Sequence, residues 1–258
     1  MVTLRFESAV LCSDIHLSTS TDKISTAFIH WLQESCLGEI KAKPEWLLIL
    51  GDLFDAWIGD DILDTANPPE YLLNLVSILK EISQSGVKVG IMHGNRDFLI
   101  GENFCKKTHA KLLPQEILLS HNQSKFNYLL MHGDQLCTDD IEHQEFRKMV
   151  LSPNWRNIFL KKDISNRLLI ASKMRKESNY AKSKKKQEIM DINVSEVEKQ
   201  LNLSDASVII HGHTHRPGSY ELPSGRKRIV LPDWRIFKDK LSGGGLLLKS
   251  SEIYQLSL

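Results

Sequence analysis

Five short apolar segments of this chain each end in a cluster of His, Asp or Asn residues. A short apolar run rich in Val, Ile and Leu is typical of a strand that is buried on both faces, and ligands gather where such strands end. The segments are AVLCSDIH (residues 9–16), WLLILGDLFD (46–55), VKVGIMHGNRD (87–97), NYLLMHGD (127–134) and SVIIHGHTH (207–215). The pattern predicts that five strand ends bring oxygen and imidazole ligands to one crevice, as a two-metal hydrolytic centre requires.

The segments around these strands indicate the fold class. Residues 25–37 and 69–83 have the pattern of helices, which gives the strand and helix alternation of an α/β sheet. After His215 the chain changes to short alternating segments, which predict antiparallel strands that complete a second sheet: GSYEL, RKRIVLPDW, GGLLLK and EIYQLSL. We therefore expect an α/β (α+β) fold with two packed mixed β-sheets flanked by helices. Residues 1–258 would form a single domain with a helical cap inserted at about residues 139–200.

A strongly basic segment lies within the predicted cap. Residues 147–186 contain 13 Lys or Arg against Asp163 and Glu177, so this segment carries +11 and the rest of the chain about −10. Apolar residues recur in and next to it at roughly helical spacing and predict amphipathic helices, with a break at Pro153 and Asn154: Phe146, Val150, Trp155, Phe159, Leu160, Ile164, Leu168, Leu169 and Met174. The segment is either a cap with a solvated basic face or a lid that binds an anionic or lipidic substrate at a membrane surface. The neighbouring His and Asp motifs favour the lid.

The cysteines and the N-terminal residues indicate the cellular compartment. Cys12, Cys36, Cys105 and Cys137 stand far apart without a CxxC motif, which argues against a zinc finger or a disulfide framework and favours a reducing environment. The first residues lack the apolar core of a signal peptide, and no stretch approaches the ~20 apolar residues needed to span a bilayer. We expect a cytoplasmic protein.

Taken one at a time, the acidic candidate ligands differ in how strongly each one indicates a metal site. Asp14 and His16 form a DxH pair whose side chains share one side of an extended segment, although such a pair is more often a surface Asp beside a turn-forming His. Asp52 follows LLIL and a Gly, and its carboxylate can contact two cations roughly 3.5–4 Å apart, which a neutral imidazole cannot do. Asp55 is as easily a helix cap or a residue behind the ligands as a ligand itself.

The neutral candidate ligands complete the set. Asn95 offers an amide oxygen that adds no negative charge near an anionic substrate, although a lone Asn after Gly94 is usually a turn residue. His132, His213 and His215 all follow strand-like runs, and two of them are spaced at i and i+2. Core packing alone does not explain three such histidines.

Taken together, SDIH, GDLFD, GNRD, HGD and HGHTH, in this order and spacing, resemble the motifs of the calcineurin-like binuclear metallophosphoesterases. The longer strings GDLFDAWIGDD, HGNRDFLIG, HGDQLCTDD, IMDIN and HGHTHRP are similar to those members that hydrolyse UDP-2,3-diacylglucosamine in lipid A synthesis. The resemblance covers Ser13 to Pro217. It implies water attack on the α-phosphorus of that substrate, release of UMP and 2,3-diacylglucosamine 1-phosphate, and two Mn²⁺ ions per chain as cofactors. Mixed N and O ligands suit manganese, and the ligand types alone would also admit zinc or iron.

The resemblance also implies roles for individual residues. One metal would be held by Asp14, His16, Asp52 and His215, and the second by Asp52, Asn95, His132 and His213. The implied catalytic residues are Asp52, Asn95 and Arg96. The residues implied to contact the substrate are Asn95, Arg96, Asp140, Ser178, Lys182, Lys185 and His213. Lys182 departs from the family pattern, which usually has Asn at this position.

Arg96 bears on the kind of bond that is cleaved. Many phosphomonoesterases of this superfamily carry His after the motif Asn, where it can protonate a poor leaving group. A sugar phosphate leaving from a pyrophosphate is already a stable anion, and an Arg can clamp phosphate with two hydrogen bonds. Arg96 therefore favours pyrophosphate cleavage, and its alternative role is a surface salt bridge to Asp97.

The cap and its partners complete the expectations. The apolar side of the cap would enclose two acyl chains, using Trp155, Phe159, Leu160, Ile164 and Leu168. Its basic face would make the protein a peripheral one on the anionic cytoplasmic face of the inner membrane. The alternatives are a soluble dinucleoside polyphosphate or other nucleotide pyrophosphatase and, more distantly, a nucleic-acid-binding protein or nuclease. We expect neither a nucleic acid nor an obligate protein partner.

Overall fold

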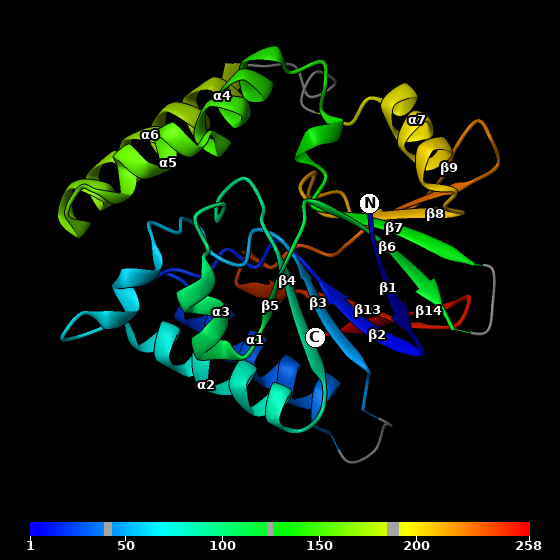
Figure 1. The fold of residues 1–258 in the computed structure, drawn as a ribbon, viewed down its shortest axis with the longest axis horizontal. Coiled ribbons are helices and arrows are strands. Elements are labelled where there is room, and N and C mark those ends of the chain that lie inside the picture. Colours follow the sequence, from blue (N-terminus) through cyan, green and yellow to red (C-terminus); the bar gives the residue numbers. More distant parts are fainter. Residues whose placement is uncertain (39–42, 123–125, 185–190) are drawn as a thin grey trace.

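Two sheets packed face to face form the body of the protein. The computed structural model describes residues 1–38, 43–122, 126–184 and 191–258, and in these residues it contains two six-stranded sheets and one two-stranded hairpin. Helices cover the outer faces of the sheets, and three further helices form a separate layer above them (Figure 1). The structure thus confirms the predicted α/β class with two mixed sheets and flanking helices.

The first sheet carries three of the five motif strands. Its strands, in spatial order, are β14 (Glu252–Ser257), β13 (Gly244–Lys249), β2 (Ser8–Cys12), β3 (Trp46–Leu50), β4 (Lys88–Met92) and β5 (Lys111–Leu113). Strands β2 to β5 run parallel, and β13 is antiparallel to both of its neighbours. Three helices belong to this half of the molecule: α1 (Asp22–Cys36), α2 (Glu70–Gln84) and α3 (Glu102–Thr108), with a short 3₁₀ helix η1 (Asp60–Asp64) before α2. The carboxyl ends of β2, β3 and β4 therefore lie at one edge.

The second sheet carries the other two motif strands. Its order is β1 (Val2–Phe6), β6 (Glu116–His121), β7 (Asn127–Met131), β8 (Val208–His211), β10 (Lys227–Val230) and β9 (Gly218–Glu221). Strand β7 runs parallel to β8, so their carboxyl ends also lie together. Helix α7 (Val194–Ser204) packs on this sheet through Val197 and Leu201.

Successive side chains of a strand point to opposite faces of the sheet, and this alternation explains why the core has two layers. Leu47 and Ile49 of β3 face α1 and α2, whereas Leu48 and Leu50 face the second sheet. All five residues of β3 are buried. Both faces of this strand are thus apolar, as expected from its continuous apolar sequence.

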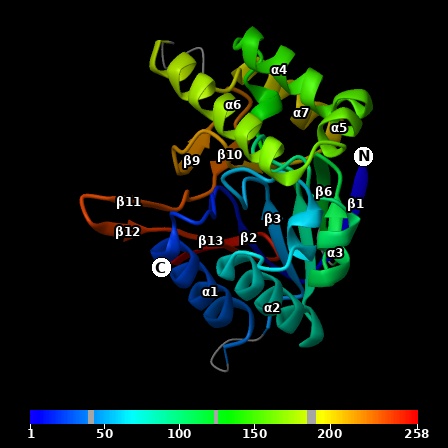
Figure 2. The ribbon, with the colours of Figure 1, turned by 90° about the vertical axis from the view of Figure 1, so that its left-hand side faces the viewer.

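The third layer is a helical cap that consists of α4 (Ile141–Leu151), α5 (Pro153–Leu160) and α6 (Ile164–Lys184). Figures 1 and 2 show it above the edge where the motif strands end, and Figure 1 shows α7 apart from it. Arginines of the cap join it to the loops below. Arg167 is 1% exposed and contacts Asp61 and the carbonyl oxygen of Ile58, and Arg156 donates to the carbonyl oxygen of Phe98.

The chain after His215 departs from the expected arrangement. The four predicted strands exist, but they do not complete one antiparallel sheet: β9 and β10 extend the second sheet, where β10 is parallel to β8, and β13 and β14 extend the first. A further hairpin, β11 (Arg235–Phe237) with β12 (Lys240–Ser242), projects from the body (Figure 2). The alternation of apolar and polar residues predicts which side chains of a strand share a face. It does not predict which strands pair, because pairing depends on contacts between residues that are distant in the sequence. Within the described residues, none of the helices has the length and apolar character to cross a membrane.

Candidate metal centre and adjoining cavities

All seven candidate ligands lie just beyond the carboxyl ends of the motif strands. Asp14 and His16 follow β2, Asp52 follows β3 and Asn95 follows β4 in the first sheet. In the second sheet, His132 follows β7, and His213 and His215 follow β8. Because the two sheets face each other, these loops meet. The backbone N–H of His213 donates to Asp14, and that of Arg96 donates to Oδ1 of Asp52 at 2.8 Å.

Five of the seven candidate ligands have a strained backbone. Asp14, His16, Asp52, His213 and His215 have φ values between 52° and 64°. Positive φ is uncommon outside glycine, costs of order 1–3 kcal/mol per residue, and clusters at functional sites. An ordinary surface turn explains neither this concentration nor the burial of Asp14 and Asp52, which are 1% and 2% exposed.

Two glycines allow the loops to approach so closely. A Cβ on Gly94 would lie 2.2 Å from Oδ1 of Asp52, and a Cβ on Gly212 would lie 2.1 Å from Oδ2 of Asp14. Any other residue would displace these carboxylates. The glycines of GNRD and HGHTH thus make room for the candidate ligands.

The first cluster consists of Asp14, His16, Asp52 and His215. Nε2 of His16 lies 3.3 Å from Nε2 of His215 and 3.9 Å from Oδ2 of Asp52. Oδ1 of Asp14 is 3.5 Å from Nε2 of His215 and 4.0 Å from Nε2 of His16. Nδ1 of His16 is buried without a hydrogen-bond partner among the described residues.

The second cluster consists of Asp52, Asn95, His132 and His213. Nε2 of His132 lies 3.6 Å from Oδ1 of Asp52 and 3.1 Å from Oδ1 of Asn95. Nδ1 of His213 lies 3.0 Å from the same Asn95 oxygen. Asp52 thus faces one cluster with each of its carboxylate oxygens.

These separations fit bound divalent cations. Two ligands roughly 2.1 Å from one ion, at angles of about 90–110°, are about 3.0–3.4 Å apart. Most of the contacts above lie near this range, and the ligand atoms of Asp14, His16 and His215, and those of Asp14, Asp52 and His132, all lie within 4.8 Å of one another. Mixed carboxylate, amide and imidazole donors suit first-row divalent metals.

The pKa values of the candidate ligands show which charges a bound cation would balance. Burial raises the pKa of Asp52 to about 7, against the opposing effect of His132. Burial lowers the pKa of His16 to about 3. Burial also acts to lower the pKa values of His132 and His215, but Asp52 and Asp14 raise the first to about 9, and Asp14 and Asp233 raise the second to about 10. The carboxylates hold protons on these two histidines that a metal would replace.

Residues behind the clusters orient the candidate ligands. Nδ1 of His132 lies 2.9 Å from the carbonyl oxygen of Leu50, which leaves Nε2 for the cluster.

Asp97 is fully buried and accepts hydrogen bonds from the backbone N–H groups of Leu53 and Gly94, both at 2.7 Å. Its carboxylate thus joins the loops after β3 and β4. No ion pair joins it to Arg96 among the described residues, contrary to the alternative role considered for Arg96.

Asp233 orients the ring of His215, and the sequence does not predict this role. Its Oδ2 lies 3.3 Å from Nδ1 of His215, and the next residue, Trp234, donates its backbone N–H to the carbonyl oxygen of Asp14 at 3.0 Å. Asp233 is 5% exposed. The LPDW string carries no ligand spacing that would have revealed this contact.

Replacing Asp233 by asparagine is expected to weaken metal binding about 10- to 100-fold, because the carboxylate that fixes the ring orientation and tautomer of His215 is lost. Competition with a chelating dye would measure the change. Asp239→Asn, at the exposed turn of the β11–β12 hairpin, is the matched control. Unchanged affinity in Asp233→Asn would mean that Asp233 serves only to position the chain.

Two cavities meet beside the clusters. One, of about 300 Å³, extends under the cap and has an apolar wall that includes Phe98, Phe146, Trp155, Phe159 and Met174. The other, of about 250 Å³, is mainly polar and extends toward the start of α1. They share four lining residues: Asp55, Asn95, Arg96 and Arg175. Arg175 of α6 pairs with Asp55 at this junction, so Asp55 connects the cap to the body.

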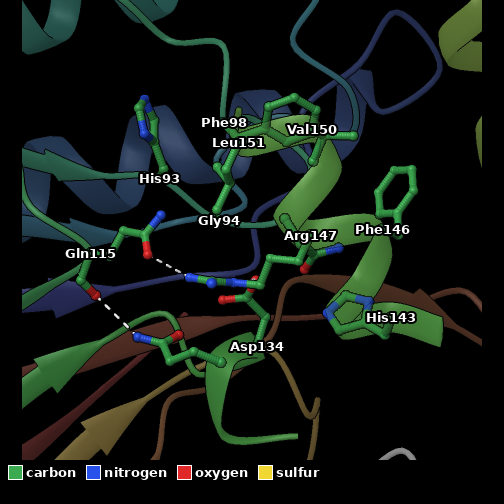
Figure 3. A pocket seen from close by; sticks show the side chains of 12 residues that line it. His93, Gly94, Phe98, Gln115, Asp134, His143, Phe146, Arg147, Val150 and Leu151 are labelled. Atoms are coloured by element: carbon green, nitrogen blue, oxygen red, sulfur yellow. Dashed lines mark hydrogen bonds and ion pairs between the residues drawn. The ribbon is translucent and has the colours of Figure 1, made fainter. Parts of the chain in front are cut away.

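A third, narrow cavity lies at the base of the cap (Figure 3). Beside it, Arg147 of α4 pairs with Asp134 at 2.8 Å and donates to the side chain of Gln115. Asp134 belongs to η2 (Asp134–Leu136), which follows the β7 motif. The cap is therefore attached to the same loop that carries His132.

The structure brings several predicted substrate residues to the cap cavity. Asn95, Arg96, Asp140 and Ser178 line it, and Asp140 also caps α4 by accepting the backbone N–H of His143. His213 lines the polar cavity instead. Lys182 lies in α6 but its side chain is not described, and Lys185 lies outside the described residues.

The prediction for the apolar side of the cap needs a correction. Trp155 and Phe159 line the cavity as expected, with rings stacked 4.8 Å apart. Leu160 and Leu168 are 42% and 51% exposed and do not line it, and Ile164 packs against the core. Helical spacing identifies apolar positions, but it does not say which of them face the protein.

The chain is similar to several known proteins. A family model described as calcineurin-like phosphoesterase matches residues 8–217. The chain is 43% identical to a UDP-2,3-diacylglucosamine hydrolase of Bordetella pertussis, over 92% of this chain and 90% of the relative. It is 41% identical to one of Haemophilus influenzae, over 86% and 89%, and 40% identical to one of Marinobacter nauticus, over 88% and 89%.

Proposed function

The chain belongs to the calcineurin-like phosphoesterase family, and we propose that it hydrolyses the pyrophosphate bond of UDP-2,3-diacylglucosamine in the lipid A pathway. The products would be UMP and 2,3-diacylglucosamine 1-phosphate. The observation that carries this proposal is the junction of an apolar and a polar cavity at Asn95 and Arg96, beside the candidate metal ligands. An amphiphilic substrate cleaved at its phosphates needs this combination. In this proposal, the cap is an insertion in a single domain that spans residues 1–258.

Two Mn²⁺ ions are the proposed cofactors. Asp14, His16, Asp52 and His215 would hold one, and Asp52, Asn95, His132 and His213 the other. When bound, such a pair lowers the pKa of a bound water and neutralises phosphate charge. The protein supplies the fixed ligand positions through the strained strand ends and through Asp97 and Asp233.

The proposed reaction forms one bond from a water oxygen to the α-phosphorus and breaks the bond from that phosphorus to the bridging oxygen. The electrons of the broken bond leave with the sugar 1-phosphate, and the water proton passes to solvent. Arg96 and Arg175 line the junction of the cavities and would stabilise charge that develops on the phosphate oxygens. Because the leaving phosphate is a weak base, no side chain has to protonate it.

Phosphorus NMR of the products tests this function. Protein loaded with Mn²⁺ would receive UDP-2,3-diacylglucosamine in ¹⁸O water, and the label is expected in UMP. Label in the sugar phosphate would contradict attack on the α-phosphorus. Cleavage of dinucleoside polyphosphates without turnover of the lipid substrate would favour a soluble nucleotide pyrophosphatase.

The apolar cavity gives a prediction about lipid recognition. Trp155→Ala removes a ring that stacks on Phe159 and contacts Phe98, and is expected to lower kcat/KM for the diacyl substrate by about 10- to 100-fold through lost apolar burial. Hydrolysis of a small chromogenic phosphodiester should change little, because such a substrate does not reach the cap. Leu73→Ala, an exposed leucine on α2, is the control. An equal loss with both substrates would indicate damage to the metal centre instead.

Peripheral attachment to the cytoplasmic face of the inner membrane is also part of the proposal. Leu160, Leu168 and Leu169 are exposed on the cap, next to basic residues such as Lys161 and Lys162. Apolar and cationic side chains together suit an anionic lipid surface.

Vesicle flotation measures this attachment. The protein is expected to float with vesicles that contain phosphatidylglycerol, and the double variant Leu168→Glu, Leu169→Glu should lower the bound fraction about 10-fold or more. Leu203→Glu, an exposed leucine on α7, should bind as the unmodified protein does. Failure of the unmodified protein to float would count against membrane attachment.

A further inference from the structure

We propose that the polar cavity beside α1 binds the nucleotide half of the substrate as a nucleoside 5′-monophosphate subsite, formed by Ser18, Ser20 and Thr21 together with Arg96 and Arg175. This inference rests on the proposed function, which requires a place for the UMP unit. The cavity has a volume of about 250 Å³, and its lining includes Ile24, which is 7% exposed. It is close to the lower limit of ~300 Å³ for small-molecule sites.

The loop before α1 holds its hydroxyl groups in a fixed arrangement. The backbone N–H of Ser18 donates to Oγ1 of Thr21 at 2.7 Å, and this hydroxyl donates to the carbonyl oxygen of Ser18 at 2.9 Å. Ser20 is exposed, and its Oγ lies 3.0 Å from Oγ of Ser18. Since a hydroxyl has one donor and two acceptor positions, the two serines retain capacity for a ligand. Uracil and ribose carry donors and acceptors on their edges that such groups can satisfy.

The charge distribution places the phosphates between the two cavities. Arg96 and Arg175 line both cavities, and Asp55 pairs with Arg175 there. A pyrophosphate at this junction directs its two substituents into different cavities. The acyl chains have a mainly apolar surface and match the cap cavity, so the nucleoside is left with the polar one.

The competing placement puts the nucleotide in the cap cavity. Four carboxylates line that cavity, Asp55, Asp140, Glu142 and Glu177, whereas Asp52 and Asp55 line the polar cavity. Carboxylates can accept hydrogen bonds from the hydroxyl and amide groups of an acylated glucosamine, and the apolar wall of the same cavity can bury its acyl chains. The apolar wall beside these acceptors therefore favours the acylated sugar at the cap and the nucleotide beside α1.

Product inhibition distinguishes the two placements. Ser20→Trp fills the polar cavity from an exposed loop position and is expected to raise the inhibition constant of UMP at least about 10-fold. The inhibition constant of 2,3-diacylglucosamine 1-phosphate should change less than about 2-fold, because that product occupies the cap cavity. Thr26→Trp, on the exposed face of α1 and outside the cavity, is the matched control. If Ser20→Trp weakens both products equally, or only the lipid product, the subsite is wrong.

A direct binding measurement does not depend on turnover. In ¹⁵N NMR of the full chain, UMP titrated with Mg²⁺ present is expected to shift the backbone amides of residues 18–24. Shifts at Asp140 and Ser178 without shifts at 18–24 would overturn the assignment, as would the absence of shifts at any amide. If UMP binds beside α1 but the diacyl substrate is not cleaved, the subsite stands and the proposed lipid substrate fails.

Discussion

Replacement of Asp52 by alanine is expected to lower kcat by more than about 10³-fold, because this carboxylate faces both candidate metal sites. Its Oδ1 lies 3.6 Å from Nε2 of His132, and its Oδ2 lies 3.9 Å from Nε2 of His16. No other described side chain contacts both histidines through separate carboxylate oxygens. Loss of Asp52 thus removes the group that would hold the two ions at a fixed separation.

Metal content separates this explanation from a loss of fold. Asp52→Ala is expected to bind fewer ions per chain, whereas Asp52→Asn retains the side-chain shape without the charge and should have weaker metal binding with an unchanged circular dichroism spectrum. Asp64→Asn is the matched control, since Asp64 pairs with Lys107 on the surface and not with the clusters. If the Asp52→Asn variant keeps both ions and a kcat within about 10-fold of the original, Asp52 is not the group that would hold the two ions together.

The motif strands could be predicted because the relevant information is local. Each strand is a short apolar run, and the carboxyl ends of parallel neighbours lie at one edge, so residues such as Asp14 and Asp52 were expected to meet. The two sheets also bring His132 and His213 to the same edge, with rings 5.2 Å apart. Local sequence pattern and sheet geometry together were enough to predict that the candidate ligands lie close together.

Features that depend on distant contacts could not be predicted. Asp233 follows β10 and reaches His215 only because β10 pairs with β8 and the next backbone N–H binds Asp14. The outward position of Leu168 depends on which face of α6 meets the body, and spacing alone does not fix this. The positive φ values of the ligands likewise follow from the closeness of two sheets, since Asp and His have no local need for this conformation.

Replacement of Arg96 by alanine is expected to lower kcat/KM for the pyrophosphate substrate by about 10²- to 10³-fold, the cost of losing a fixed charged donor at a reacting phosphate. Two backbone contacts hold Arg96 in place. Its N–H donates to Asp52 at 2.8 Å, and its carbonyl oxygen accepts the backbone N–H of Trp57 at 3.0 Å. These contacts survive the substitution, so the metal ligands should remain in position and metal content should not change.

Lysine at position 96 tests whether geometry or charge alone is needed. An ammonium group restores the charge but not the paired N–H groups of a guanidinium, so Arg96→Lys is expected to recover only part of the lost activity. The loss should also depend on the leaving group: it should be large for the pyrophosphate, where Arg96 can contact both phosphates, and smaller for a chromogenic diester with one. Equal losses for both substrates, or full recovery of activity by lysine, would show that Arg96 contributes only its positive charge. The preference for a pyrophosphate substrate would then come from the two cavities on either side of Arg96.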